Sequence, residues 1–289
     1  MKSIIAFGLV AGVSVAVLSG LRAADLETIR DVTYVQRGSQ DLKADVYVPN
    51  GPGPFPAVLV VHGGGWRSGS KDRFGRFADR LAGEGFTAVA INYRLAPDDK
   101  FPAQIDDCKN AVRWMRKNAA KYKIDPDRIG ALGYSAGGHL VALLGVTDPS
   151  CGLEGPDADG TSTRLQCVVA GGAPCDFRLI PPNVDRLAYW LGGTRAEKQA
   201  AYEQASPLNF ASKDDPPILF FHGEDDRLVP ILGAQTMVAK LTSLGVTARL
   251  VTIPGAGHPQ AVGDERAWTE SVKFLQEHLQ NTAAKKNAS

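Results

Sequence analysis

Short apolar runs alternate with longer amphipathic stretches along most of the chain. The runs at residues 32–35 and 44–48 alternate apolar and polar side chains, which predicts half-buried strands. The later runs are apolar almost throughout, which is typical of strands buried on both faces of a sheet. These later runs are residues 57–61, 87–92, 129–133, 167–170, 218–221 and 249–253.

The stretches between these runs carry apolar side chains at helical spacing. Within residues 102–122, Ile105, Cys108, Val112 and Met115 form one stripe, and basic side chains occupy most of the opposite face. Similar patterns predict helices at residues 73–83, 232–244 and 267–279. Strands that alternate with helices predict one α/β domain over residues 25–281, with a mostly parallel sheet of about eight strands covered on both sides.

One connection departs from this rhythm. Residues 176–213 separate two predicted strands and contain two adjacent prolines, two adjacent glycines and a short helical piece at 196–204. A connection of this length is typical of a lid, a binding loop or a small inserted domain. The sequence predicts a lid-like insertion here, and a plain surface excursion stays open as the alternative.

The two ends of the chain differ from the middle. Residues 1–24 begin with Met1 and Lys2, continue through a long uncharged apolar run and end near Ala23 and Ala24. This pattern predicts a signal peptide and therefore a secreted or periplasmic protein. The apolar run is also long enough for an uncleaved membrane anchor. The polar residues 282–289 predict a disordered tail.

Composition narrows the range of partners. The 289 residues are 44% hydrophobic and carry a net charge of +1, without a basic stripe or an acidic tail. We therefore expect small, roughly neutral substrates, no nucleic-acid partner and no obligate protein partner. The four cysteines lack metal-site spacing, which predicts no metal site. We expect Cys108 to be a buried free thiol, whereas an oxidising compartment would permit pairing among Cys151, Cys167 and Cys175.

A candidate nucleophile lies between a predicted strand and a helical run. Gly133-Tyr134-Ser135-Ala136-Gly137 follows the apolar strand directly and has the form Gly-x-Ser-x-Gly. Between a strand and a helix, this pattern permits a strained turn that exposes the serine hydroxyl. A serine hydroxyl is a weak nucleophile unless a base takes its proton.

Five histidines are candidates for that base. His258 lies in a flexible glycine-rich segment after the last predicted strand. His139 is one helical turn past Ser135 and should point into packing, and His222 ends a strand. We interpret His62 as a hydrogen-bonding residue of a turn, and expect His278 to be a solvated helix residue. His258 is therefore the predicted base.

Three consecutive acids, Glu224, Asp225 and Asp226, follow the preceding strand. At this point the chain resembles an α/β-hydrolase of the bacterial esterase/lipase branch, related to hormone-sensitive lipase and to the BD-FAE, feruloyl esterase-like enzymes. The family's His-Gly-x-x-Asp-x-x-Val-Pro motif matches from His222 to Pro230. The resemblance implies the three-layer α/β-hydrolase sandwich, and it selects Asp226 as the acid that orients His258 in a Ser-Asp-His triad.

The resemblance also explains the three consecutive glycines in the stretch His62-Gly63-Gly64-Gly65-Trp66. A tight turn or a mobile loop would be simpler reasons for them. In the family, this turn supplies N–H groups to the oxyanion hole. The resemblance therefore implies that Gly64 or Gly65, together with Ala136, stabilises the negatively charged oxygen of the reaction intermediate.

The resemblance covers residues 57–279, and it includes the stretches 93–97 and 101–103, for which we expect a structural role. Two features depart from hormone-sensitive lipase relatives: Tyr134 replaces an aspartate before the serine, and the N-terminal cap helices are absent. Both departures favour secreted, openly accessible esterases. Near the site, the aromatic residues Trp66, Tyr134, Phe177 and Trp190 are candidate substrate contacts.

These features predict a serine esterase that forms an acyl-enzyme and needs no cofactor or metal. The expected substrates are small-molecule or polysaccharide-linked esters, with short-chain, acetyl or feruloyl groups. An amide hydrolase, either an arylformamidase or a peptidase, is the alternative among enzymes, because a similar glycine-tryptophan turn occurs in formamidases. A hydrolase fold that is only a binding module is the other alternative.

Overall fold

The computed structural model describes residues 26–38 and 40–280. The predicted signal peptide or anchor (1–24) and the polar tail (282–289) lie outside this range. None of the helices within it has the length and apolar character needed to cross a membrane.

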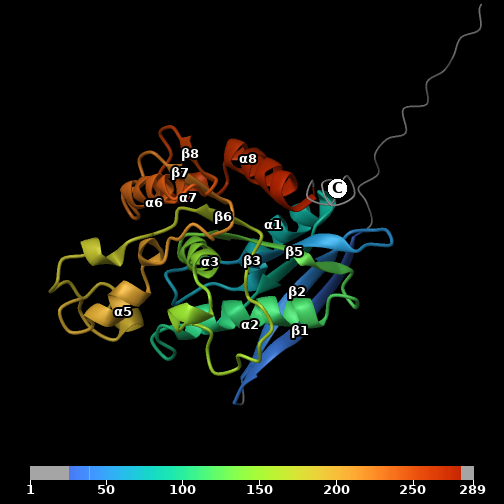
Figure 1. Cartoon of the computed structure of the whole chain (residues 1–289), viewed down its shortest axis with the longest axis horizontal. Coiled ribbons are helices and arrows are strands. Elements are labelled where there is room, and N and C mark those ends of the chain that lie inside the picture. Colours follow the sequence, from blue (N-terminus) through green and yellow to red (C-terminus); the bar gives the residue numbers. More distant parts are fainter. Residues whose placement is uncertain (1–25, 39, 281–289) are drawn as a thin grey trace, which may run out of the picture.

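An eight-stranded sheet forms the centre of the molecule, in the order β1-β2-β4-β3-β5-β6-β7-β8 (Figure 1). From β4 to β8, neighbouring strands are parallel, whereas β2 is antiparallel to both β1 and β4. The strands are β1 (Glu27–Arg37), β2 (Gln40–Val48), β3 (Phe55–Val61), β4 (Thr87–Ile91), β5 (Ile124–Tyr134), β6 (Cys167–Gly171), β7 (Ile218–Gly223) and β8 (Ala248–Ile253).

The central strands are buried on both faces, as their apolar sequences predict. In β3, Ala57, Leu59 and Val61 belong to one hydrophobic cluster, and Val58 and Val60 belong to the other. This alternation follows from the two-residue period of a strand, and β4, β6 and β7 repeat it. The sheet therefore needs a helical layer on each face.

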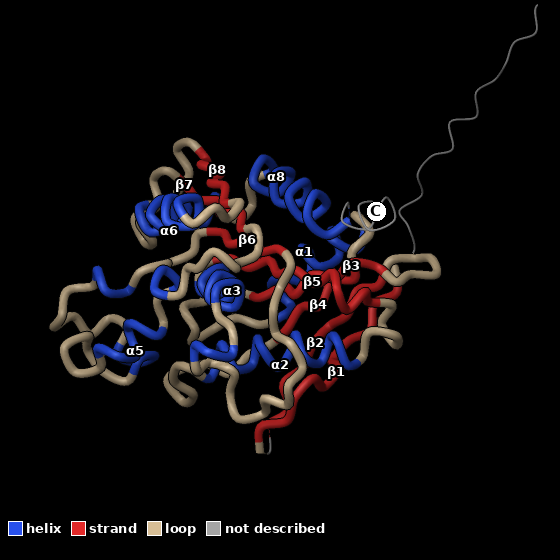
Figure 2. The backbone as a smooth tube through the Cα atoms, viewed as in Figure 1, coloured by secondary structure: helices blue, strands red, loops and turns tan. Residues whose placement is uncertain are grey.

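Helices supply both layers, and Figure 2 shows them flanking the strands. The apolar sides of α1 and α8 join one cluster, and those of α2, α3 and α6 join the other. This arrangement is the predicted three-layer α/β-hydrolase sandwich. The helices of these layers are α1 (Lys71–Gly83), α2 (Ala103–Lys117), α3 (Ala136–Val146), α6 (Leu232–Ser243) and α8 (Glu265–Leu275), with α7 (His258–Ala261) between β8 and α8.

Several element ends differ from the sequence prediction, among them those of α2 and β1. Helix α2 ends at Lys117 instead of continuing to Tyr122, because the Asn118 side chain donates to the carbonyl of Trp114 and the chain then turns through Lys123, whose φ is 52°. Strand β1 is also longer than the predicted 32–35, because its pairing with β2 extends beyond the apolar core.

The 176–213 connection contains short helical pieces: η2 (Phe177–Leu179), α4 (Ala188–Leu191), α5 (Gln199–Gln204) and η3 (Pro207–Asn209). The predicted piece at 196–204 corresponds to α5. All four cysteines are free, and Cys108 is buried as predicted, so the pairing left open by the sequence does not form in this structure.

Candidate active site

The candidate nucleophile occupies a strained turn between β5 and α3. Ser135 has φ 58° and ψ −121°, a conformation that costs an L-residue about 1–3 kcal/mol. Glycines make this turn possible: a Cβ on Gly137 would lie 2.1 Å from the carbonyl oxygen of Val61, and one on Gly133 would lie 2.4 Å from that of Gly137. The Ser135 N–H donates to the carbonyl of Gly171 at 2.8 Å, which ties the turn to β6.

The structure brings together the three predicted triad side chains. The Oγ atom of Ser135 lies 2.9 Å from Nε2 of His258, the first residue of α7. The Nδ1 atom of His258 lies 2.6 Å from Oδ2 of Asp226. Residues from three separate segments of the chain therefore form one continuous hydrogen-bond chain, in which His258 can accept the serine proton while Nδ1–H donates to the carboxylate.

Asp226 differs from the other two acids in its surroundings. Its carboxylate is buried, and Oδ1 accepts hydrogen bonds from the N–H groups of Leu228 and Val229 at 3.0 and 2.8 Å. Glu224 and Asp225 are exposed. The two backbone bonds fix the carboxylate so that Oδ2 is directed at His258.

The glycine turn packs directly beside Ser135, because β3 and β5 are parallel neighbours and the segments after them emerge side by side. A Cβ on Gly63 would lie 2.8 Å from the carbonyl oxygen of Tyr134 and 3.3 Å from Cβ of Ser135. Gly64 has φ 123°, and a Cβ there would lie 1.9 Å from the carbonyl oxygen of Ser68. A tight, glycine-dependent turn therefore lies where the oxyanion hole is expected, and Ala136 begins α3 on the other side of Ser135.

Over residues 44–241, the sequence matches the BD-FAE family. The chain belongs to this family. It is similar to esterase LipC of Mycobacterium tuberculosis, with 33% identity over 71% of this chain and 53% of LipC. It therefore spans about half the length of LipC, and the same holds for two further esterases of that organism.

Solved structures agree with this assignment. A truncated carbohydrate esterase from gut microbiota has a TM-score of 0.78 and 28% identity over 89% of this chain and 98% of its own. The esterase Est2 of Thermogutta terrifontis has a TM-score of 0.74 and 27% identity over 88% of this chain and 92% of its own. These similarities confirm the predicted α/β-hydrolase esterase/lipase branch and its fold.

In this BD-FAE chain, a second histidine contacts the Asp226 carboxylate, a contact that was not expected from the sequence. Nε2 of His222 lies 2.8 Å from the carbonyl oxygen of Val229 and 3.3 Å from Oδ2 of Asp226. Since a carbonyl requires a donor, Nε2 carries the proton. Among the described residues, the buried Nδ1 atom has no hydrogen-bond partner, and burial lowers the pKa of His222. A neutral His222 therefore adds a donor beside Oδ2. Its place in the His-Gly-x-x-Asp motif is the signal that could have indicated this contact.

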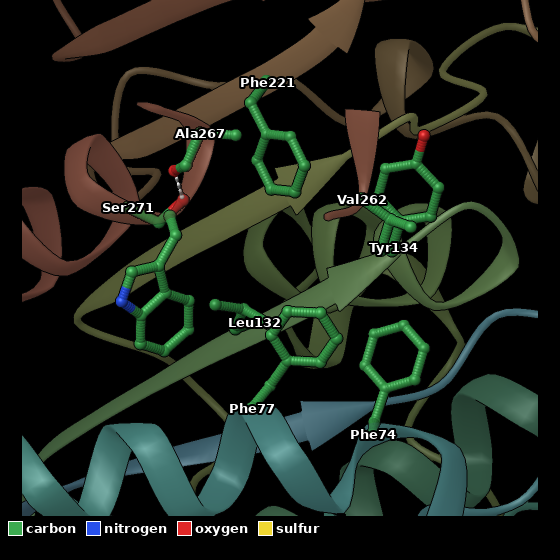
Figure 3. A pocket seen from close by; sticks show the side chains of 9 residues that line it. Phe74, Phe77, Leu132, Tyr134, Phe221, Val262, Ala267 and Ser271 are labelled. Carbon is green, nitrogen blue, oxygen red and sulfur yellow. Dashed lines mark hydrogen bonds between the residues drawn. The ribbon is translucent and has the colours of Figure 1, made fainter. Parts of the chain in front are cut away.

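Tyr134, a predicted substrate contact, holds the segment that carries His258. Its hydroxyl donates to the carbonyl oxygen of His258, and its ring centroid lies 5.0 Å from that of His258 and 5.7 Å from that of Phe221. The ring lines a small apolar pocket between α1 and α8, and the hydroxyl points away from that pocket (Figure 3). Its position is that of a support for His258.

The other aromatic candidates lie in the core. The rings of Trp66 and Trp190 stack at 3.8 Å and 1°, and Phe177 packs edge-on against both. All three are buried, and Trp190 is fully so. The placement corrects the expectation that they contact substrate, because their faces are covered by one another and by His139.

Two more histidines of this family member are structural. Nδ1 of His62 donates to the carbonyl oxygen of Gly63 at 2.7 Å, in agreement with its predicted role in the turn. His139 accepts from Nε1 of Trp66 at 3.2 Å and donates through Nε2 to the carbonyl oxygen of Ala205 at 2.7 Å. Burial lowers the pKa of each to about 4, so both are neutral at pH 7.

Within residues 26–38 and 40–280, no group of three or more His, Cys, Asp and Glu side chains is arranged to hold a metal ion. Cofactor-free chemistry stays a prediction.

Proposed function

We propose that this chain is a serine esterase whose triad is Ser135, His258 and Asp226. The hydrogen-bond chain from Ser135 through His258 to Asp226 supports this proposal more than any other observation. The family assignment and the esterase names of the relatives point in the same direction.

The proposed reaction proceeds in two acyl-transfer steps. His258 takes the Ser135 proton while Oγ forms a bond to the ester carbonyl carbon, and the carbonyl oxygen becomes an oxyanion. The N–H groups of Gly64, Gly65 and Ala136 donate to that oxygen. His258 then gives the proton to the alcohol oxygen as its bond to carbon breaks, which leaves an acyl-enzyme. Water repeats the sequence, releases the acid and restores the Ser135 hydroxyl.

The oxyanion donors carry a large share of the proposed rate enhancement. One preorganised donor is typically worth about 3 kcal/mol of activation free energy, a factor of roughly 10² in rate. The helix that starts at Ala136 directs the positive end of its dipole toward the same oxygen. Asp226 stabilises the His258 imidazolium that accompanies the oxyanion.

We propose short acyl esters, including those attached to carbohydrates, as the substrates. Two neighbours support this choice: one is a carbohydrate esterase, and Est2 has been solved with propionate and with butyrate bound. The apolar N-terminal run supports export of the protein, so that polymeric substrates would be accessible. Cell fractionation tests the export.

Ser135→Ala tests the proposed function. We expect p-nitrophenyl acetate hydrolysis to fall by at least about 10⁴-fold with an unchanged Tm, because the nucleophile is lost and the packing is kept. Near wild-type activity of Ser135→Ala would refute the assignment. A panel of acetyl, butyryl, octanoyl and feruloyl esters tests the substrate class, with matching anilides to test amide cleavage. Preference for octanoyl esters would contradict short acyl groups.

A further inference from the structure

The glycine turn is intrinsically flexible, whereas its proposed catalytic role requires fixed N–H directions. Peptide planes between glycines rotate easily, because both signs of φ are accessible to glycine. A plane that flips turns its N–H away from the oxyanion. Oxyanion donors stabilise charge only when they are already oriented, so the planes of Gly64 and Gly65 need to be held.

Three successive planes of this turn are held through their carbonyl oxygens. The Gly63 oxygen accepts from Nδ1 of His62 at 2.7 Å, and the Gly64 oxygen accepts from Oγ and N of Ser68 at 3.0 and 3.1 Å. The Gly65 oxygen accepts from the Tyr189 hydroxyl at 2.7 Å. In a planar trans peptide, the carbonyl of one residue and the N–H of the next point in opposite directions. Each of these bonds therefore fixes the direction of the following N–H.

Tyr189 belongs to α4, within the 176–213 connection, and is distant in sequence from the turn. The neighbouring Trp190 stacks on Trp66, which has a positive φ of 57° directly after the glycines. The carbonyl oxygen of Trp66 accepts from the N–H of Ala96 at 2.8 Å. One short helix therefore contacts the turn twice, through a hydroxyl on Gly65 and an indole on Trp66.

We infer that Tyr189 is a positioning residue for the oxyanion hole, and that the 176–213 connection supports this turn. The inference rests on the proposed function, because it concerns the donors of that reaction. Ser68 holds the adjacent peptide plane in the same way. The carbonyl that Tyr189 holds belongs to the Gly65–Trp66 plane, which is joined to the donor plane Gly64–Gly65 through the two torsion angles of Gly65. Loss of the Tyr189 hydroxyl frees these torsion angles, so that the Gly65 N–H is aligned in a smaller fraction of the molecules when the oxyanion forms.

The test compares Tyr189→Phe with Tyr202→Phe in the full chain. Tyr202 is in the same connection, and its hydroxyl also donates to a glycine carbonyl, that of Gly193 at 3.2 Å, away from the glycine turn. We expect Tyr189→Phe to lower kcat about tenfold, with KM within twofold and an unchanged Tm. Tyr202→Phe should keep wild-type kcat.

A trifluoromethyl ketone provides the readout that a merely structural role would not change, because its serine adduct carries an oxyanion. Its inhibition constant should rise in proportion to the fall in kcat/KM for Tyr189→Phe, and should not change for Tyr202→Phe. Unchanged kcat in Tyr189→Phe, equal losses in the two variants, or a loss of kcat without weaker inhibition would overturn the inference.

Ser68 provides a second test if Tyr189→Phe fails to fold, since Ser68 is exposed. Ser68→Ala should lower kcat severalfold, and Ser68→Thr, which keeps a hydroxyl, should restore it; no loss in Ser68→Ala would count against the inference. Failure of the proposed function is distinguishable, because then Ser135→Ala keeps its activity or the wild-type protein has none.

Discussion

Acid should weaken the fold through the two buried histidines that hold the glycine turn. His62 and His139 each have a pKa lowered to about 4 by burial, against an ordinary value of about 6.5 in an unfolded chain. Between these two values the unfolded chain binds more protons than the folded one. The free energy of unfolding therefore decreases as the pH falls from about 6.5 to 4.

The size of the effect follows from the same two pKa values. A proton-linkage calculation gives a loss of about 2 kcal/mol per histidine between pH 7 and pH 5, and about 3 kcal/mol per histidine when both values have been passed. Both side chains are almost completely buried, at 1% and 0% exposure, so solvent screens little of this effect. A loss of this size is a large part of the free energy of unfolding of a typical domain, which is about 5–15 kcal/mol.

Urea unfolding at pH 7 and pH 5 measures the decrease in the free energy of unfolding. The variant His139→Gln separates the contribution of His139 from that of His62. Glutamine keeps one acceptor and one donor for Trp66 and Ala205, and it does not titrate in this range. We expect the decrease between pH 7 and pH 5 to be about 2 kcal/mol smaller in His139→Gln than in the wild type. Tyr202→Phe should show the wild-type decrease. The same decrease in all three proteins would refute the reasoning.

Two further changes test the site directly. Asp226→Asn should lower kcat for p-nitrophenyl acetate by about 10⁴-fold, because an amide does not hold His258 in its productive tautomer. Asp225→Asn changes an exposed residue, and its kcat should stay within about twofold of the wild-type value. Equal losses in the two variants would contradict the choice of Asp226 as the acid. Gly64→Ala should remove most activity, because its Cβ would lie 1.9 Å from the Ser68 carbonyl oxygen at a φ of 123°. Gly83→Ala places its Cβ in open space and should keep wild-type activity and Tm. An active, stable Gly64→Ala would show that the turn tolerates a side chain.

Sequence patterns within single segments predicted the features of the fold that depend on neighbouring residues in the chain. The period of two in β3 sends Leu59 and Val60 to opposite faces, and the apolar sequence shows that both faces are buried. The strained turn at Ser135 was predictable because Gly133 and Gly137 flank it and a strand precedes it. The end of α2 was not, because an Asn118 cap competes with a helical pattern that continues further.

The features that the sequence did not predict depend on contacts between segments that are distant along the chain. Trp66 and Trp190 were recognisable as aromatic residues near the site, but only the fold shows that their rings stack on each other. The contact of His222 with Asp226 depends on how the loop after β7 folds back on the strand. The hydroxyl of Tyr189 meets Gly65 across more than a hundred residues of chain. A pattern within one segment does not specify which distant segment covers it.

At this site, the packing of the surrounding structure maintains strained backbone conformations. Ser135 and Trp66 both hold a positive φ, and they lie on either side of the turn that is expected to bind the oxyanion. Neither conformation is favourable alone, so the surrounding structure has to impose it. For Trp66 the constraint is visible: its indole is stacked on Trp190 and bonded to His139, both of which are fully buried. The core therefore stabilises the conformation that the proposed chemistry requires, and substitutions that loosen this aromatic cluster should reduce activity before they unfold the protein.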